Sequence, residues 1–156
     1  MMSTLKLSTY VKRRTGVNLG HSHSLKNMFV RSFGANSFAL FWHYWNPIWS
    51  YYLAKYIQKP CSRIMPHSFA LIITFTISGA LHDLAVSLVK LTPIFFFTPW
   101  FLLMAILVIA VNLLKVNYAN LTWGGRAFIN ASFIVSSFLI TIFIEQKLLN
   151  YFDTLS

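Results

Sequence analysis

Three long apolar stretches constrain this chain more than any other feature of its sequence. Residues 68–89, 93–114 and 127–144 are each apolar enough to cross the hydrocarbon core of a bilayer, about 30 Å thick, as a helix. The composition agrees, because 10% of the residues are charged, whereas about a quarter are charged in a soluble domain. The sequence therefore predicts an all-α integral membrane protein in which these stretches are transmembrane helices.

A fourth segment, residues 37–57, is long enough to cross a bilayer but is not uniformly apolar. Its centre reads "WHYWNPIWSYY", with six Trp and Tyr side chains of the kind that favour the membrane–water interface. Pro47 interrupts the helix near residue 46 and frees backbone groups, which then need partners in protein or water. We therefore expect a kinked re-entrant or interfacial helix rather than a plain span.

The lysines and arginines predict the topology. The basic residues fall into three groups, which are the six of the N-terminal segment, then Lys55, Lys59 and Arg63, and then Lys115 and Arg126. These groups share the cytoplasmic side only if residues 37–57 do not cross. The N-terminus is then cytoplasmic and the C-terminus lies on the opposite side. The chain divides into a basic segment, residues 1–36, expected to be a loop or a short surface helix, and a membrane domain, residues 37–156.

Several classes of function find no support in the residues. A net charge of +10 is typical of nucleic-acid binding, but here the basic residues flank apolar segments, so no nucleic-acid partner is expected. His21 and His23 lack further ligands at zinc spacing, so no metal site is expected. The single cysteine, Cys61, is interpreted as a spectator thiol. The sequence contains no serine nucleophile elbow, Walker loop or dinucleotide fingerprint.

An ionisable pair, His82 and Asp83, interrupts the first predicted span in "ISGALHDL". Ionisable residues inside a membrane usually face a bundle interior or a water-filled cavity and mark a functional site. The helical period places Thr74, Ser78 and His82 on one face, with Asp83 about 100° further around the helix.

A neutral imidazole in such a cavity can accept a proton from a hydroxyl or a thiol, so His82 is the candidate general base. Asp83 is expected to have its own partner, a basic or aromatic donor from residues 37–63. A structural role for both side chains, as hydrogen-bonding groups between helices, is the alternative.

Two motifs together resemble a known family. "FWHYWN", residues 41–46, is followed after a basic loop by "SGALHD", residues 78–83, so that Asn46 and His82 are 36 residues apart. This order and spacing resemble the signature of the membrane-bound O-acyltransferases (MBOAT), and the wax-synthase and sterol-acyltransferase branches look most similar. The resemblance covers residues 33–115.

The resemblance implies transfer of an acyl group from a thioester, usually acyl-CoA, to an acceptor hydroxyl. His82 matches the catalytic histidine of the family, and Asn46 matches its second signature position. Trp42 and Trp45 match the aromatic motif and are expected to shape the substrate pocket, together with Ser78 and Asp83. For Trp49, Tyr51 and Tyr52, an interfacial belt without a role in catalysis is an equal alternative.

Family members usually have eight or more membrane helices around a tunnel, which is more than this chain offers. The chamber is therefore expected to be completed by a homo-oligomer or by a separate membrane partner. The acyl-CoA phosphates would bind basic side chains on the cytoplasmic side; the candidates are Arg13, Arg14, Lys55, Lys59 and Arg63.

Two other functions remain open at this level. The chain could be a non-catalytic membrane subunit or a degenerate member of the family that binds a partner or lipid. It could also be a small transporter or proton relay that uses His82 and Asp83. The intact pair of Asn46 and His82 favours the enzyme over the first alternative. The lack of a charged residue in the middle of another span argues against the second.

Overall fold

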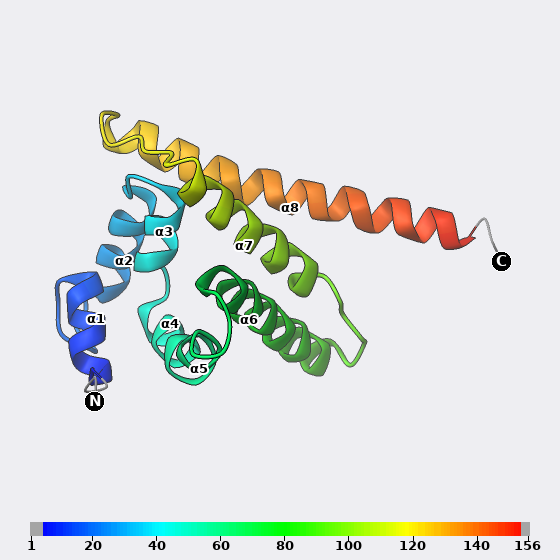
Figure 1. The fold of residues 1–156 in the computed structure, drawn as a ribbon, viewed down its shortest axis with the longest axis horizontal. Helices are drawn as coiled ribbons and strands as arrows, with labels where there is room; N and C mark the ends of the chain where they lie inside the picture. Colours follow the sequence, from blue (N-terminus) through cyan, green and yellow to red (C-terminus); the bar gives the residue numbers. More distant parts are fainter. Residues whose placement is uncertain (1–4, 154–156) are drawn as a thin grey trace.

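A computed structural model describes residues 5–153 of the chain, which form helices and connecting loops without any strand. Figure 1 shows that α6, α7 and α8 are the long elements and that the shorter helices gather near the start of α6. The elements in chain order are α1 (Leu7–Thr15), α2 (Ser24–Phe33), α3 (Phe38–Tyr44), α4 (Pro47–Leu53), the π-helical turn η1 (Ala54–Gln58), α5 (Lys59–Cys61), α6 (His67–Lys90), α7 (Phe97–Leu113) and α8 (Trp123–Asp153). The all-α prediction is confirmed.

Two of the long helices are long and apolar enough to cross a membrane. These are α6, with 24 residues and a mean hydropathy of 1.7, and residues Trp123–Leu148 of α8, with a mean hydropathy of 2.2. Helix α7 is also apolar but has 17 residues, which makes it about 25 Å long at 1.5 Å per residue. It begins at residue 97 rather than at 93, so it is shorter than the predicted span, and a third crossing stays a prediction.

The late start of α7 has a local cause in the loop before it. Leu91 ends α6 in the left-handed region, with φ of 56°. The Ser87 hydroxyl then accepts the Ile94 N–H at 2.8 Å, and the Asp83 carboxylate accepts the N–H groups of Phe96 and Phe97. These bonds hold residues 92–96 in a non-helical loop, and the helix begins after it at Phe97.

The segment 37–57 is divided at the position that Pro47 predicts. Helix α3 ends at Tyr44, and α4 begins at Pro47, whose missing N–H costs nothing at the first helical position. Asn46, between them, has a left-handed backbone with φ of 38°, which asparagine tolerates better than most residues. Neither half is long enough to cross a bilayer by itself.

The N-terminal segment is more ordered than the loop or single short helix expected of it. It forms α1 and α2, which are tied together by side chains that bond to the end of α1. The Asn27 side chain donates to Thr15 O at 2.9 Å, and Arg31 donates to Arg14 O at 3.0 Å. Trp123, at the start of α8, donates to Val30 O at 3.0 Å and so anchors α2 to α8.

A small aromatic core fixes α3 against α7 and α8. Phe38 and Phe41 are fully buried, and they pack with Val108 and Val111 of α7. The rings of Phe38 and Phe133 stack at 4.8 Å between centroids, which brings α8 into the same core. Because α3 is held here, the chain that follows it is directed back toward α6.

A candidate site in a cavity beside α6

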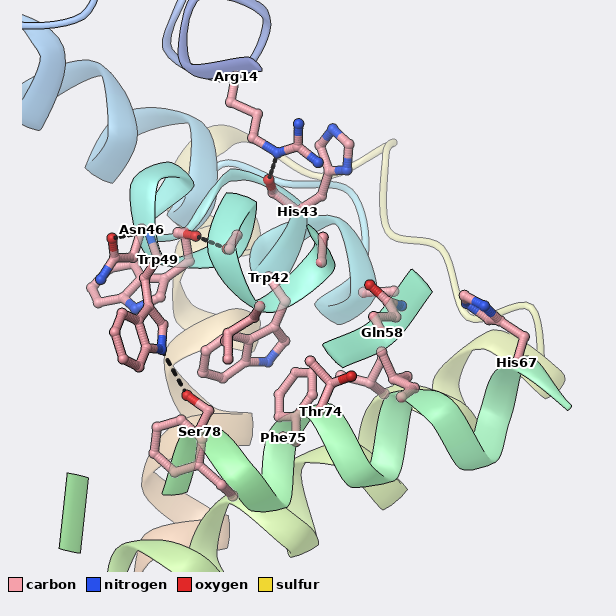
Figure 2. A pocket seen from close by; sticks show the side chains of 18 of the residues that line it. Arg14, Trp42, His43, Asn46, Trp49, Gln58, His67, Thr74, Phe75 and Ser78 are labelled. Carbon is pink, nitrogen blue, oxygen red and sulfur yellow. Dashed lines mark hydrogen bonds between the residues drawn. The ribbon is translucent and has the colours of Figure 1, made fainter. Parts of the chain in front are cut away.

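A cavity of about 330 Å³ lies between α6 and the aromatic segment α3–α4, with a volume suited to a small-molecule ligand. Helices α1 and α7 and the turn η1 complete its wall. Figure 2 shows Trp42 near its centre, Asn46 and Trp49 on one side, and Gln58 and His67 on the other. The residues that line it are Tyr10, Arg14, Ala39, Trp42, His43, Trp45, Asn46, Trp49, Ser50, Leu53, Ala54, Gln58, His67, Leu71, Thr74, Phe75, Ser78, His82, Phe101, Val108 and Asn112.

The cavity brings together five of the six residues that the sequence singles out. Trp42, Trp45 and Asn46 reach it from the end of α3 and the junction with α4. Ser78 and His82 reach it from α6, where Thr74 lines it as well, as the spacing of four residues predicts.

A path of hydrogen bonds connects Asn46 to His82 without direct contact between their side chains. The Asn46 Oδ1 accepts the backbone N–H of Trp49 at 3.2 Å and so caps α4. The Trp49 Nε1–H donates to the Ser78 hydroxyl at 2.8 Å, as Figure 2 shows. One turn further along α6, His82 Nδ1 lies 2.6 Å from the Ser78 carbonyl oxygen.

The contact with the Ser78 carbonyl decides which nitrogen of His82 carries the proton. A carbonyl oxygen only accepts hydrogen bonds, so the neutral ring must be protonated at Nδ1. The lone pair then lies on Nε2. Three aromatic rings hold the imidazole in place, with centroid distances of 6.0 Å to Trp49, 5.8 Å to Phe97 and 5.0 Å to Phe101.

Asp83 does not line the cavity, although it follows His82 directly. It is buried, with 5% of its surface exposed, and its carboxylate accepts four hydrogen bonds at the start of α7. The donors are the N–H groups of Phe96, Phe97 and Thr98 and the Thr98 hydroxyl, at 2.6 to 2.9 Å. The expected donor from residues 37–63 is therefore wrong: the partner is a helix N-terminus, whose free N–H groups favour a carboxylate.

Gly79 makes this junction possible. A Cβ at that position would lie 2.5 Å from Phe97 O and 2.8 Å from Thr98 Cα, both of them backbone atoms. Only a residue without a side chain lets the start of α7 approach α6 so closely. The small residues around Ser78 thus serve helix packing on one side of α6 and the cavity on the other.

The wall nearest the N-terminal segment carries positive charge. The Arg14 guanidinium lies 3.5 Å from the centroid of the Tyr10 ring, and its Nε donates to His43 O at 2.8 Å. Burial lowers the pKa of Arg14. Burial also lowers the pKa of His43, and the nearby positive charge of Arg14 lowers it further. No acidic side chain lines the cavity in the part of the chain that the structure describes.

Sequence reasoning missed several residues of this wall. The sequence alone is equally consistent with Trp49 as an interfacial tryptophan, and only its bond to Ser78 distinguishes it. Gln58 lines the cavity from the π-helical turn η1, and such turns are frequent at functional sites. Of the basic candidates for anion binding, Arg14 alone lines the cavity.

Among residues 5–153, no three His, Cys, Asp or Glu side chains are grouped so that they could hold a metal ion. Comparison of the chain with protein-family models, with curated proteins and with solved structures finds no match.

Proposed function

We propose that the protein is a membrane O-acyltransferase that moves an acyl group from a thioester, acyl-CoA in the first instance, to an acceptor hydroxyl. The observation that carries the proposal is the state of His82 in the cavity. With Nδ1 bonded to a carbonyl, Nε2 is the basic nitrogen, and it shares the cavity with the second signature residue, Asn46.

The reaction uses His82 as general base. Nε2 takes the proton from the acceptor hydroxyl while the hydroxyl oxygen attacks the carbonyl carbon of the thioester. The C–S bond then breaks, and the leaving thiolate takes the proton from the imidazolium. Because Asn46 Oδ1 is occupied as the cap of α4, its Nδ2–H groups are the part that can donate to the carbonyl oxygen as negative charge develops there.

The donor's phosphates would bind at the positive wall. Arg14 has a fixed position on Tyr10, uses its Nε for His43 O, and faces no carboxylate across the cavity. Its two terminal nitrogens can therefore bind a phosphate in the bidentate manner that suits a guanidinium. The other basic candidates, on α1, η1, α5 and the loop after α5, add long-range attraction.

In the membrane, α6 and α8 would span the bilayer, with α7 as a shorter third crossing. Figure 1 shows α1 to α5, the start of α6 and the start of α8 at one end of the molecule, and these elements carry most of the basic residues. We propose that this end is cytoplasmic, with α3–α4 as the re-entrant or interfacial element. A second copy of the chain or another membrane protein would complete the chamber around the cavity.

The test is thioester turnover by the purified full-length protein in lipid nanodiscs. Acetyl-CoA and palmitoyl-CoA are the donors, membrane extract supplies the acceptors, and release of free CoA thiol is measured. We expect His82→Ala to lower turnover about 100-fold or more, the usual contribution of a general base. The matched control is His23→Gln, on the loop before α2.

Equal turnover by wild type and His82→Ala would disprove the proposal. Absence of turnover with every donor and acceptor would favour the non-catalytic subunit instead.

A further inference from the structure

We infer that Trp49 is the positioning residue of this site. It holds His82 in the tautomer that is protonated at Nδ1, and so it keeps Nε2 available as the base. The inference rests on the proposed function only for its kinetic consequence. The tautomer itself can be measured without any reaction.

Trp49 lies where the two motifs meet. Its backbone N–H is bonded to Asn46 and its indole N–H to Ser78, so one residue links α4 to the face of α6 that carries His82. Its ring also contacts the imidazole directly, edge to face, at 6.0 Å and 88°. No other residue in the described part of the chain makes both a side-chain hydrogen bond to Ser78 and a ring contact to His82.

The physical effect is confinement of the imidazole. A neutral histidine can carry its proton on either nitrogen, and in a mobile ring the two forms exchange. Here the carbonyl oxygen of Ser78 favours Nδ1–H, but only while the ring keeps its present rotamer. Phe97 and Phe101 lie at 36° and 34° to the imidazole, whereas Trp49 stands across it at 88°. The bond to the Ser78 hydroxyl fixes the indole in this position. Without that bond the indole can move, and the imidazole can then rotate away from the carbonyl.

The chain offers a matched control for the hydrogen bond. Trp100 of α7 donates its indole N–H to the Ser137 hydroxyl at 3.0 Å, the same kind of bond as that between Trp49 and Ser78. Trp100 does not line the cavity and has no ring contact with His82. Trp49→Phe and Trp100→Phe therefore remove equivalent interactions at two sites, and only the first is predicted to affect His82.

The first measurement is a ¹⁵N spectrum of the histidine side chains in the full-length protein, in nanodiscs at a pH where His82 is neutral. His82→Gln assigns the signals. We expect the wild type and Trp100→Phe to show one protonated nitrogen, Nδ1, and one unprotonated nitrogen, Nε2. In Trp49→Phe the two signals should move toward each other as the tautomers mix.

The second measurement is turnover with the donor that the wild type uses. Trp49→Phe should lower kcat about tenfold or more with little change in KM, because the base is misplaced while the donor site is intact. Trp100→Phe should stay within about twofold of wild type. Ser78→Ala should resemble Trp49→Phe, and the double variant should be no worse than either alone, since both changes remove the same link.

The inference is overturned if His82 carries its proton on Nε2 in the wild type, or if Trp49→Phe changes the tautomer no more than Trp100→Phe does. If the wild type turns over no thioester but the tautomer responds as predicted, the proposed function fails and the positioning role of Trp49 stands. If the wild type turns over thioester normally but the tautomer is unchanged in Trp49→Phe, the positioning role of Trp49 fails and the proposed function stands.

Discussion

The cavity around His82 and the junction around Asp83 are neighbouring regions along α6, but their polar side chains differ in how fully they are hydrogen-bonded. At the junction, four donors satisfy both oxygens of one carboxylate, and a glycine lets the backbones meet. In the cavity wall, Nδ1 of His82 is bonded to the Ser78 carbonyl, whereas Nε2 has no hydrogen bond to any described residue.

This difference separates structure from chemistry in an apolar helix. A buried charge with every partner in place stabilises the fold and has nothing left to offer a substrate. A polar group that is only half satisfied, in a cavity large enough for a ligand, is the one to examine for function. Adjacent positions in the sequence thus have different roles, because they lie about 100° apart around the helix.

The largest effect on folding is expected from the junction. Asp83→Ala removes the acceptor of four hydrogen bonds and leaves the start of α7 unpaired in an apolar environment. We expect it to lower the free energy of unfolding by about 3 kcal/mol or more, since bonds to a charged group are the strong ones. Denaturant unfolding in detergent micelles measures this loss. His82→Ala, measured in parallel, should cost far less stability, and equal losses would contradict the comparison.

Gly79→Ala tests the close approach at the same junction. The added methyl group would meet backbone atoms of Phe97 and Thr98, which cannot rotate away as a side chain can. A loss of about 2 kcal/mol is expected, within the usual range for overpacking. Gly124→Ala in the first turn of α8 is the control, because a Cβ there meets nothing within 4 Å. A stable Gly79→Ala variant would mean that α6 and α7 lie further apart than described.

On the cavity side, Arg14→Gln should weaken binding of the donor and leave chemistry intact. We expect KM for acyl-CoA to rise about tenfold, or about 1.4 kcal/mol, with kcat within about twofold. The control is Arg13→Gln, since Arg13 is exposed and does not line the cavity. The effect should disappear with a donor that lacks the nucleotide phosphates, such as an acyl pantetheine. If Arg14→Gln raised the KM of both donors equally, Arg14 would not be the residue that binds the phosphates.

The smallest effect is expected at a third site, formed by Tyr118 and Asn130. Tyr118 donates its hydroxyl proton to Asn130 Oδ1. The Asn130 amide donates in turn to Phe33 O and Ala35 O, both at 3.0 Å. Burial raises the pKa of Tyr118 to about 12, above the value of about 10 for an unfolded chain. The stability from this shift is therefore present below pH 10 and is lost as the pH rises from about 10 to about 12.

Tyr118→Phe should cost about 1 kcal/mol at pH 8, for one hydrogen bond lost and Asn130 left short of a donor. Between pH 10 and 11 its thermal midpoint should fall less steeply with pH than that of the wild type. Parallel curves for the two proteins would show that Tyr118 ionises as freely in the folded chain as in the unfolded one.

The apolar runs, the helical spacing of polar residues and the helix-breaking proline predicted much of the fold and of the candidate site. The apolar run at 68–89 agrees with α6 to within one residue at each end, because composition alone decides where such a helix can lie. Pro47 predicted the division of the aromatic segment, and the spacing of Thr74, Ser78 and His82 predicted a shared face. These features depend on neighbours within one or two turns of a helix.

Other features depend on contacts that no local pattern records. The span predicted from residue 93 becomes a shorter helix because a carboxylate from α6 fixes where α7 begins. The partner of Asp83, the role of Trp49 and the entry of Arg14 into the cavity each require two elements to be packed together. The sequence by itself determined that this is a helical, apolar chain with a histidine on a polar face. Only the tertiary structure decided how that histidine is confined, because the rings around it come from two other helices, α4 and α7.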